Sequence, residues 1–329
     1  MQVIFFGSAL PNSSSPQRNP PNGYMLGYLA TAALVSAAAY YLQAPSARRL
    51  QAVKPNEERV VVVGCTSGIG RETALLYARR HAKLILFARR QELLDSLQEE
   101  VSALGGQAYT VCGDATVEAD VKKLAKTTQD TLSGVDTLII CAGAISVQPF
   151  LNLCGGLDGH PQQDPMEAVR RITAVNYYAP IQLTQYFLPL LIRTSASPNI
   201  IVISSLAGKA GAPTRSLYAG SKHAVHGFFD SLRVEVAMHN VHVGLVCPGT
   251  VNTDLRQSAV DLDLNSAVHG STKGKLEPKA VAQAIVHASD QRQREVLLPR
   301  LMGIGANWGK LLAPGLVDSF AAKKYGFAA

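Results

Sequence analysis

Residues 204–224, SSLAGKAGAPTRSLYAGSKHA, decide how the rest of the chain is interpreted. Tyr218 and Lys222 stand four residues apart, so a helix beginning after Ser216 would carry both side chains on one face, about one turn apart. A free tyrosine, with a pKa of about 10, is a poor acid–base catalyst at neutral pH, and a fixed ammonium beside it favours the phenolate. The spacing therefore predicts a tyrosine whose pKa is lowered by a lysine.

Ser205 follows the apolar run at 200–203, one residue beyond Ser204, and the run predicts a buried strand. Its hydroxyl would then emerge at a strand end beside the helix, where open α/β sheets bind their ligands. A tyrosine and a lysine at this spacing also occur together by chance, so the upstream sequence has to decide between chemistry and coincidence.

Upstream, short apolar or β-branched runs alternate with amphipathic segments. Strands crossed over by helices predict a parallel, doubly wound sheet, and we expect a single Rossmann-type α/β domain at residues 59–298. The expected strands are 59–63, 83–87, 108–112, 137–141, 200–204 and 241–246, and the expected helices are 70–81, 91–104, 118–132, 165–194 and 218–238.

Composition excludes several classes of protein. A chain of 329 residues that is 47% hydrophobic forms a substantial core. The five cysteines are odd in number and irregular in spacing, which indicates free thiols in a reducing compartment. The net charge of +7 is spread along the chain, so it favours weak attraction to an anionic membrane surface and not nucleic acid. The pairs His223/His226 and His239/His242 lack a third ligand, and no metal site is expected.

The N-terminal residues suggest a membrane anchor. Residues 1–22 form a polar tail, and residues 23–43 are uncharged and about as long as a helix that crosses a bilayer, with tyrosines near both ends. A signal peptide and a buried core helix are the alternatives. Four basic residues follow the span, against Arg18 before it, so the positive-inside rule places the catalytic domain in the cytosol, after a polar linker at 44–58. The four are Arg48, Arg49, Lys54 and Arg59. We expect a single-pass protein of the endoplasmic reticulum membrane.

A glycine-rich turn, GCTSGIG at residues 64–70, lies between the first expected strand and its helix. Glycines there permit a tight turn and let backbone N–H groups approach a pyrophosphate. The turn does not end in Lys-Ser or Lys-Thr, which argues against a nucleoside triphosphatase. The second strand ends in Arg89 with no acidic residue nearby, so a 2′-phosphate is favoured over a free ribose and the expected cofactor is NADP(H). The alternative is that Arg89 and Arg90 are solvated surface residues.

Together these motifs, in this order, resemble the short-chain dehydrogenase/reductase family from about residue 59 to residue 249. The turn matches that family's TGxxxGIG element, residues 141–143 match its NNAG, and residues 248–253 match its PGxVxT. Its catalytic tetrad matches Asn176, Ser205, Tyr218 and Lys222.

The resemblance implies a role for each matched residue. Tyr218 is the proton donor or base, Lys222 lowers its pKa and bonds the nicotinamide ribose, Ser205 polarises the substrate oxygen and Asn176 holds a water. The implied cofactor-binding residues, besides Tyr218 and Lys222, are Gly64, Thr66, Ser67, Gly68, Ile69, Gly70, Arg89, Asp114, Ala142, Gly143, Pro248, Gly249, Val251 and Thr253. Val63, Ile140 and Cys141 replace polar residues of the family's pattern, which puts local rigidity and cofactor affinity in doubt.

The anchor and the SSLAGK segment resemble membrane-bound members of the family, namely the 11β-hydroxysteroid dehydrogenase and dehydrogenase/reductase member 7 groups. Their substrates are steroids, retinoids or other lipids, and the anchored reductases of 3-keto sphingoid bases and of acyl-dihydroxyacetone phosphate remain alternatives. The expected substrate loop is 254–277, and the insert 151–164 either shapes access or is a plain surface loop. The apolar extension 299–329 caps the entrance, dips into the membrane or packs at a dimer interface.

The sequence thus predicts a membrane-anchored, NADP(H)-dependent oxidoreductase that interconverts a lipophilic ketone or aldehyde and its alcohol. Its expected partners are a lipophilic small molecule and membrane lipid, with a homodimer left open and nucleic acid excluded. The rival interpretation is a cofactor-binding membrane scaffold or sensor without turnover.

Overall fold

A computed structural model of the chain describes residue 28 and residues 31–32, 47–161, 164–261 and 274–327. The chain divides into two units, Met1–Ala44 and Pro45–Ala329, and the enzyme-like fold lies in the second. The expected membrane span at 23–43 lies outside the described residues apart from Tyr28, Thr31 and Ala32. No helix among the described residues is long and apolar enough to cross a bilayer. The anchor therefore stays a prediction.

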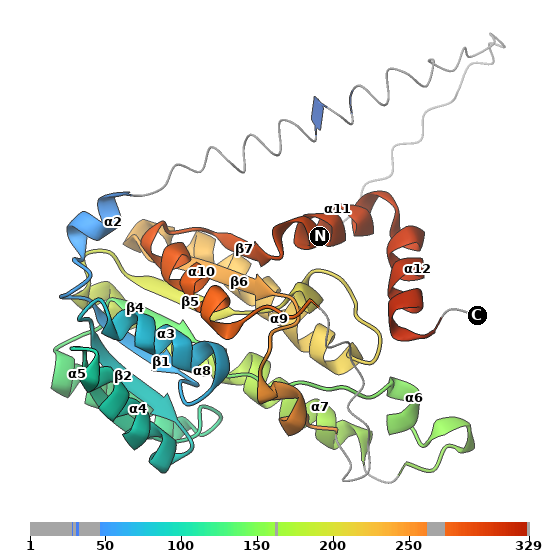
Figure 1. Cartoon of the computed structure of the whole chain (residues 1–329), viewed down its shortest axis with the longest axis horizontal. Helices are drawn as coiled ribbons and strands as arrows, with labels where there is room; N and C mark the ends of the chain where they lie inside the picture. The colour runs from blue at the N-terminus through green and yellow to red at the C-terminus, as the bar shows by residue number, and fades with distance from the viewer. Residues whose placement is uncertain (1–27, 29–30, 33–46, 162–163, 262–273, 328–329) are drawn as a thin grey trace, which may run out of the picture. The chain divides into compact units, whose positions relative to one another are not determined.

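Parallel strands form one sheet in the order β3-β2-β1-β4-β5-β6-β7 (Figure 1). Runs such as Arg59–Val63 become strands because their β-branched side chains pack on both faces of a buried sheet. The order reverses between β1 and β4, and ligands of such sheets bind beyond the carboxyl ends at this switch point. The strands are β1 Arg59–Val63, β2 Lys83–Ala88, β3 Gln107–Cys112, β4 Thr137–Ile140, β5 Asn199–Ile203, β6 His242–Pro248 and β7 Glu295–Leu298.

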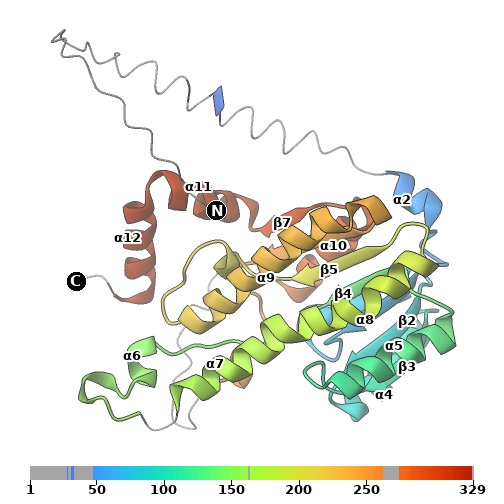
Figure 2. The same cartoon turned by 180° about the vertical axis from the view of Figure 1, so that it is seen from behind.

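Helices cover both faces of the sheet (Figures 1 and 2). One apolar core lies between the sheet and α3 (Gly68–Ala78), α4 (Gln91–Ala103) and α10 (Pro278–Asp290). The other lies between the sheet and α5 (Glu118–Leu132), α8 (Ala179–Thr194) and α9 (Ser216–Glu235). The predicted doubly wound α/β fold is confirmed.

Three features of the chain order were not expected. The predicted helix at 165–194 consists of α7 (Pro165–Thr173), a π-helical turn at Ala174–Tyr178, and α8. Both α10 and β7 follow the expected substrate loop, where no strand or helix was assigned. The insert after β4 contains a short helix, α6 (Phe150–Leu153).

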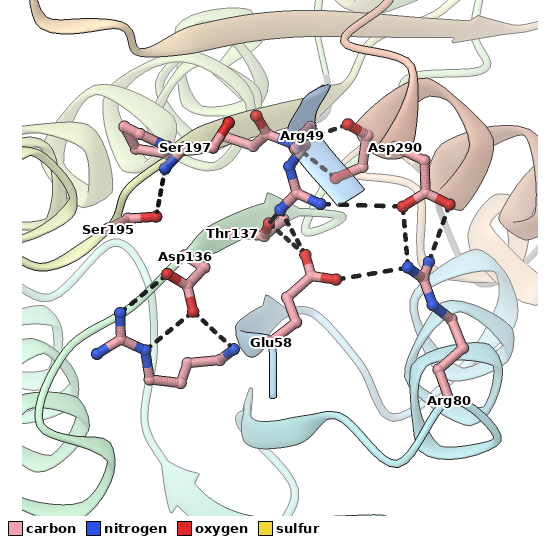
Figure 3. Close-up of polar contacts among 12 residues, drawn as sticks. Arg49, Glu58, Arg80, Asp136, Thr137, Ser195, Ser197 and Asp290 are labelled. Atoms are coloured by element: carbon pink, nitrogen blue, oxygen red, sulfur yellow. Dashed lines mark hydrogen bonds and ion pairs between the residues drawn. The ribbon is translucent and has the colours of Figure 1, made fainter. Parts of the chain in front are cut away.

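The segment 44–58 was expected to be a polar linker. From residue 47 onward it instead packs onto the domain. Helix α2 (Ala47–Ala52) places Arg49 in the interior, where its Nη2 donates to Glu58 Oε1 at 2.6 Å and to Thr137 Oγ1 at 2.7 Å (Figure 3). Arg80 and Asp290 complete this ion cluster. Both Arg49 and Glu58 have fully buried side chains, so Arg49 is neutralised by the domain and is not a free charge beside a membrane.

The C-terminal extension forms two further helices, α11 (Arg300–Leu312) and α12 (Pro314–Tyr325). They carry large apolar side chains that remain exposed, among them Leu301 at 85% and Phe320 at 74%. Lysines at the end of each helix accompany this surface. The three roles considered for the extension stay open.

Candidate active site

The turn between β1 and α3 leaves no room for side chains at two of its glycines. A Cβ on Gly70 would lie 2.1 Å from the carbonyl oxygen of Gly64. Gly68 has a φ of +52°, and its Cβ would come within 2.8 Å of Thr253 Cγ2. Ser67, the N-cap of α3, makes no side-chain capping bond. This turn fits the pyrophosphate of a dinucleotide, which needs bare backbone at a helix N-terminus.

The segment after β4, Ala142 and Gly143, links this turn to the expected catalytic residues. A Cβ on Gly64 would lie 2.7 Å from the amide nitrogen of Ala142, so the end of β4 touches the turn. A Cβ on Gly143 would lie 3.5 Å from Asn176 Oδ1 and 3.8 Å from Lys222 Nζ. Ala142 and Gly143 therefore lie between the expected cofactor site and the expected catalytic groups.

The segment after β6 lies on the other side of the site. Pro248 ends the strand, and its carbonyl accepts a hydrogen bond from Ser205 Oγ at 3.3 Å. The Gly249 N–H donates to the Leu298 carbonyl at 2.6 Å, and Val251 pairs with Leu276 in an isolated bridge. Thr253 lies against Gly68, so the segment 248–253 extends from Ser205 to the glycine-rich turn.

At the expected adenine end of the cofactor site there are two arginines, Arg89 and Arg90. Arg89 is exposed, with its Nη1 3.9 Å from Asp114 Oδ2. Arg90 donates from Nη2 to Thr66 Oγ1 of the turn at 3.3 Å. Ile69 packs against the core between the sheet and α3, so its side chain supports the turn from beneath. Only Arg89 was expected to bind the cofactor. The structure shows that Arg90 is the arginine that contacts the glycine-rich turn.

Helix α9 carries the expected acid–base pair. Tyr218 and Lys222 are both buried, and Lys222 Nζ lies 5.9 Å from the centre of the Tyr218 ring. The same ammonium donates to the Ile203 carbonyl at 2.9 Å, which ties it to the end of β5. Ser205 begins the next turn of chain, where its Oγ accepts from the Ala207 N–H at 3.1 Å.

Asn176 lies in the π-helical turn at Ala174–Tyr178, and turns of this kind often carry functional residues. The side chain is fully buried. Its Oδ1 accepts from the Ala144 N–H at 2.7 Å, and its Nδ2 donates to the Ala144 carbonyl and to Ser221 Oγ, each at 2.9 Å. The structure thus brings all four matched tetrad residues to the carboxyl edge of the sheet.

The electrostatics of the pair differ from the expectation. Burial raises the pKa of Tyr218, while the hydrogen bond with Ser205 and then the charge of Arg215 lower it. Burial also lowers the pKa of Lys222 to about 8. The charge of Arg215 thus also acts on the phenol, beside the Lys222 ammonium 5.9 Å from the ring centre.

A small apolar cluster of buried residues packs around Tyr218. Tyr218 belongs to a small cluster with Ile145, Val147, Ile172 and Val260, which come from the loop after β4, from α7 and from the loop after β6. Of the expected substrate loop, residues 262–273 lie outside the described part of the chain. A separate groove of about 560 Å³ lies between residues 211–223 and α11 and α12.

His226, one turn beyond Lys222, is a second buried group with no role assigned from the sequence. Its Nε2 lies 2.9 Å from Ser204 Oγ and 3.6 Å from Cys247 Sγ, and its Nδ1 lies 3.7 Å from Glu295 Oε1. These ligand atoms lie within 4.8 Å of one another. The cluster is a poor cation site, because Glu295 already pairs with Lys209 and burial raises the pKa of the Cys247 thiol. Only the tertiary fold brings these residues together.

These features define the class of protein. A family model described as short chain dehydrogenase matches residues 58–263, and the chain belongs to this family of oxidoreductases.

Several curated proteins are similar to this chain over most of its length. The chain is 35% identical over 273 residues to dehydrogenase/reductase SDR family member 7B of Bos taurus, covering 80% of each chain. It is 31% identical over 285 residues to a dehydrogenase/reductase SDR family protein 7-like of Dictyostelium discoideum, covering 85% of each.

Solved structures share the fold. A short-chain dehydrogenase/reductase from Burkholderia phymatum in complex with NAD superposes with a TM-score of 0.64 at 20% identity, over 76% of this chain and 91% of the other. An alcohol dehydrogenase from Thermococcus sibiricus complexed with 5-hydroxy-NADP superposes with a TM-score of 0.61 at 22% identity, over 73% and 95%.

Proposed function

We propose that this protein is a membrane-anchored, NADP(H)-dependent reductase of a lipophilic ketone or aldehyde. One observation carries the proposal: Tyr218, Lys222, Ser205 and Asn176 converge at the carboxyl edge of the sheet, beside a bare glycine turn.

In this proposal the chain's own residues hold the carbonyl and supply the proton. Ser205 donates a hydrogen bond to the carbonyl oxygen, and Tyr218 donates its phenolic proton to that oxygen as the alcohol forms. When bound, the nicotinamide cofactor supplies the hydride. Lys222 stabilises the tyrosinate that remains, and Asn176 orders the path by which the proton is replaced.

The choice of NADP(H) rests on the two arginines at the end of β2. Arg90 donates to Thr66 of the turn and Arg89 is exposed near Asp114, and a 2′-phosphate is the part of NADP(H) that such guanidinium groups recognise. No acidic residue stands at that strand end to bind an adenine ribose.

The lipophilic substrate and the membrane location are supported by two features. Tyr218 packs in a small apolar cluster, and α11 and α12 expose large apolar side chains next to lysines. Attachment to the endoplasmic reticulum membrane, with the domain in the cytosol, would hold the site beside a substrate dissolved in the bilayer. A homodimer is compatible with the same exposed surface.

Oxidation of NADPH by the full chain in detergent tests the proposal, with a panel of steroid, retinal, 3-keto sphingoid and acyl-dihydroxyacetone ketones. We expect turnover of at least one class, and a loss of about 10³-fold or more in Tyr218→Phe, because the general acid is removed while the ring stays in place. Binding of NADPH should be retained in the variant.

A non-catalytic cofactor-binding scaffold is the alternative. It predicts that NADPH binds and that Tyr218→Phe changes no measurable property. Tight binding without turnover of any member of the panel would favour it over the reductase.

A further inference from the structure

His226 connects three segments that meet at the candidate active site. The residue lies on α9, one turn beyond the lysine of the tetrad, and only 6% of it is exposed. Its Nε2 lies 2.9 Å from Ser204 Oγ, just after β5, and 3.6 Å from Cys247 Sγ, in β6. These two contacts directly precede Ser205 and Pro248, which are hydrogen-bonded to each other. The ring therefore touches the residue before each partner of that bond.

The turn that contains Ser205 packs against the same ring. A Cβ on Gly208 would lie 2.7 Å from His226 Cδ2 and 3.0 Å from its Nε2, so the backbone of the turn lies against the imidazole. The Gly208 N–H donates to the Ser205 carbonyl at 2.9 Å. The Ala207 N–H donates to Ser205 Oγ at 3.1 Å. A change in where the turn rests on His226 would therefore move the Ser205 hydroxyl.

The surroundings of the ring determine which nitrogen carries its proton. Nδ1 is buried, makes no hydrogen bond to any described residue and lies 3.7 Å from Glu295 Oε1, and a carboxylate there favours a proton on that nitrogen. Nε2 is then the acceptor, and the Ser204 hydroxyl donates to it. Glu295 also pairs with Lys209, so an ion pair fixes the other side of the ring.

The order Ser204, His226, Glu295 is that of a nucleophilic triad, but the geometry does not allow that chemistry. Only 2% of Ser204 is exposed, so no substrate reaches its hydroxyl. The 3.7 Å between His226 and Glu295 is too long for a hydrogen bond. Burial lowers the pKa of His226 to about 3, which makes it a poor base at neutral pH. Any effect of His226 on chemistry must therefore pass through a neighbouring residue.

We infer that His226 is a positioning residue of the reductase, which holds the Ser205 hydroxyl in line with the acid–base pair of α9. It does so through its bond with Ser204 and its contact with the turn at 206–208. Because one helix carries both His226 and the acid–base pair, the ring sets the distance between that pair and the strand end that carries Ser205. This inference rests on the proposed reductase function and adds a residue outside the tetrad to it.

Removal of the ring should lower turnover and leave binding nearly unchanged. For His226→Ala, as the full chain in detergent, we expect kcat for ketone reduction to fall about 10- to 100-fold, because a misplaced orienting group weakens the transition state most. The KM of the ketone and the Kd of NADPH should stay within about threefold. The ketone is the member of the panel that the wild type reduces fastest. An unchanged kcat would overturn the inference.

Conservative variants test whether the acceptor at Nε2 is what matters. The side-chain oxygen of Gln reaches about as far as Nε2 and that of Asn does not, so His226→Gln should recover most of the lost kcat and His226→Asn should not. Ser204→Ala removes the donor and should lower kcat as well. His239→Gln, at an exposed position, is the matched control and should keep the wild-type kcat. A His226→Gln protein as slow as His226→Ala would count against the inference.

A double-variant cycle shows whether the effect passes through Ser205. Added to Ser205→Ala, the change His226→Ala should lower kcat by less than about a further threefold, because the group that His226 positions is already absent. A full additional loss would mean that His226 acts by another route, and the inference would then be wrong.

Hydrogen exchange provides a readout that does not depend on turnover. In His226→Ala, peptides covering residues 204–210 should exchange about tenfold faster than in the wild type, while peptides of β1 keep their protection. Ser204→Ala, which keeps the ring, should change the same peptides in the same direction. Unchanged exchange in both variants would count against the positioning role, whereas absence of any turnover in the wild type would count against the reductase function itself.

Discussion

The ammonium of Lys222 lies one helical turn from Tyr218, 5.9 Å from the centre of its ring, inside the protein. Burial lowers the pKa of Lys222 to about 8 and raises that of Tyr218. The pair therefore holds its working charge state, a protonated phenol and a protonated amine, only up to mildly alkaline pH.

We expect kcat/KM for ketone reduction to fall as the pH rises above about 8, because Lys222 then loses the proton that stabilises the tyrosinate. A steady-state pH profile from 6 to 10 measures this. Lys222→Arg keeps its charge at these pH values and should move the fall to higher pH. The same alkaline limb in Lys222→Arg would assign the titration to another group.

The two arginines at the end of β2 should set the cofactor preference. In Arg89→Ser/Arg90→Ser we expect the Kd of NADPH to rise about tenfold or more, because the 2′-phosphate loses its charged donors, while that of NADH stays within about threefold. Fluorescence titration measures both constants. Arg79→Ser, an exposed charge at the far end of α3, is the control. Equal weakening of both cofactors would mean that the change damaged the turn.

The Arg49–Glu58 pair should be important for stability. Arg49→Met leaves the fully buried Glu58 carboxylate without its main partner, and we expect the free energy of unfolding to fall by about 3–5 kcal/mol. Urea denaturation followed by circular dichroism measures it. Lys54→Met breaks the exposed Lys54–Glu57 pair and should cost less than about 1 kcal/mol.

A double variant separates charge from packing. Arg49→Met/Glu58→Leu removes both charges together and should be more stable than Arg49→Met alone. If the two were equally unstable, the loss would come from packing around Arg49.

His226 should make folding sensitive to acid. Burial and the charge of Lys209 lower its pKa to about 3, so between pH 6.5 and 3 the unfolded chain binds a proton that the folded one does not. Stability is therefore lost as the pH falls through that window, by up to about 1.4 kcal/mol per pH unit from this residue. His226→Gln should reduce the slope, while His239→Gln, at an exposed position, should not. An unchanged slope in His226→Gln would place the acid sensitivity elsewhere.

Local patterns predicted the parts of the fold that depend on neighbours in the chain. The run Val60–Val63 could only be a buried strand, and Tyr218 and Lys222 could only share a face if α9 was a helix. The tetrad residues were found from their order and spacing, and the structure brings them together as that order implies.

The rest depends on contacts across the sequence. Arg49 belongs to a polar stretch that looks like a linker, and nothing in that stretch shows that Glu58 and Thr137 would surround it. Arg215 resembles any surface arginine until α9 and the loops around it close over the side chain. His226 was considered only in a metal-binding pair with His223, because its actual contacts, Ser204 and Glu295, lie 22 and 69 residues away along the chain.

The burial of Arg49 also determines where the catalytic part of this chain begins. A shortened protein that starts at Leu50, within the expected linker at 44–58, would lose the arginine and leave Glu58 and Thr137 facing a void at the amino end of β1 and β4. One that starts at Pro45 would keep it. The smallest self-sufficient piece of this protein is therefore longer than the family's own motifs indicate, and its first indispensable residue lies ten positions before the first strand.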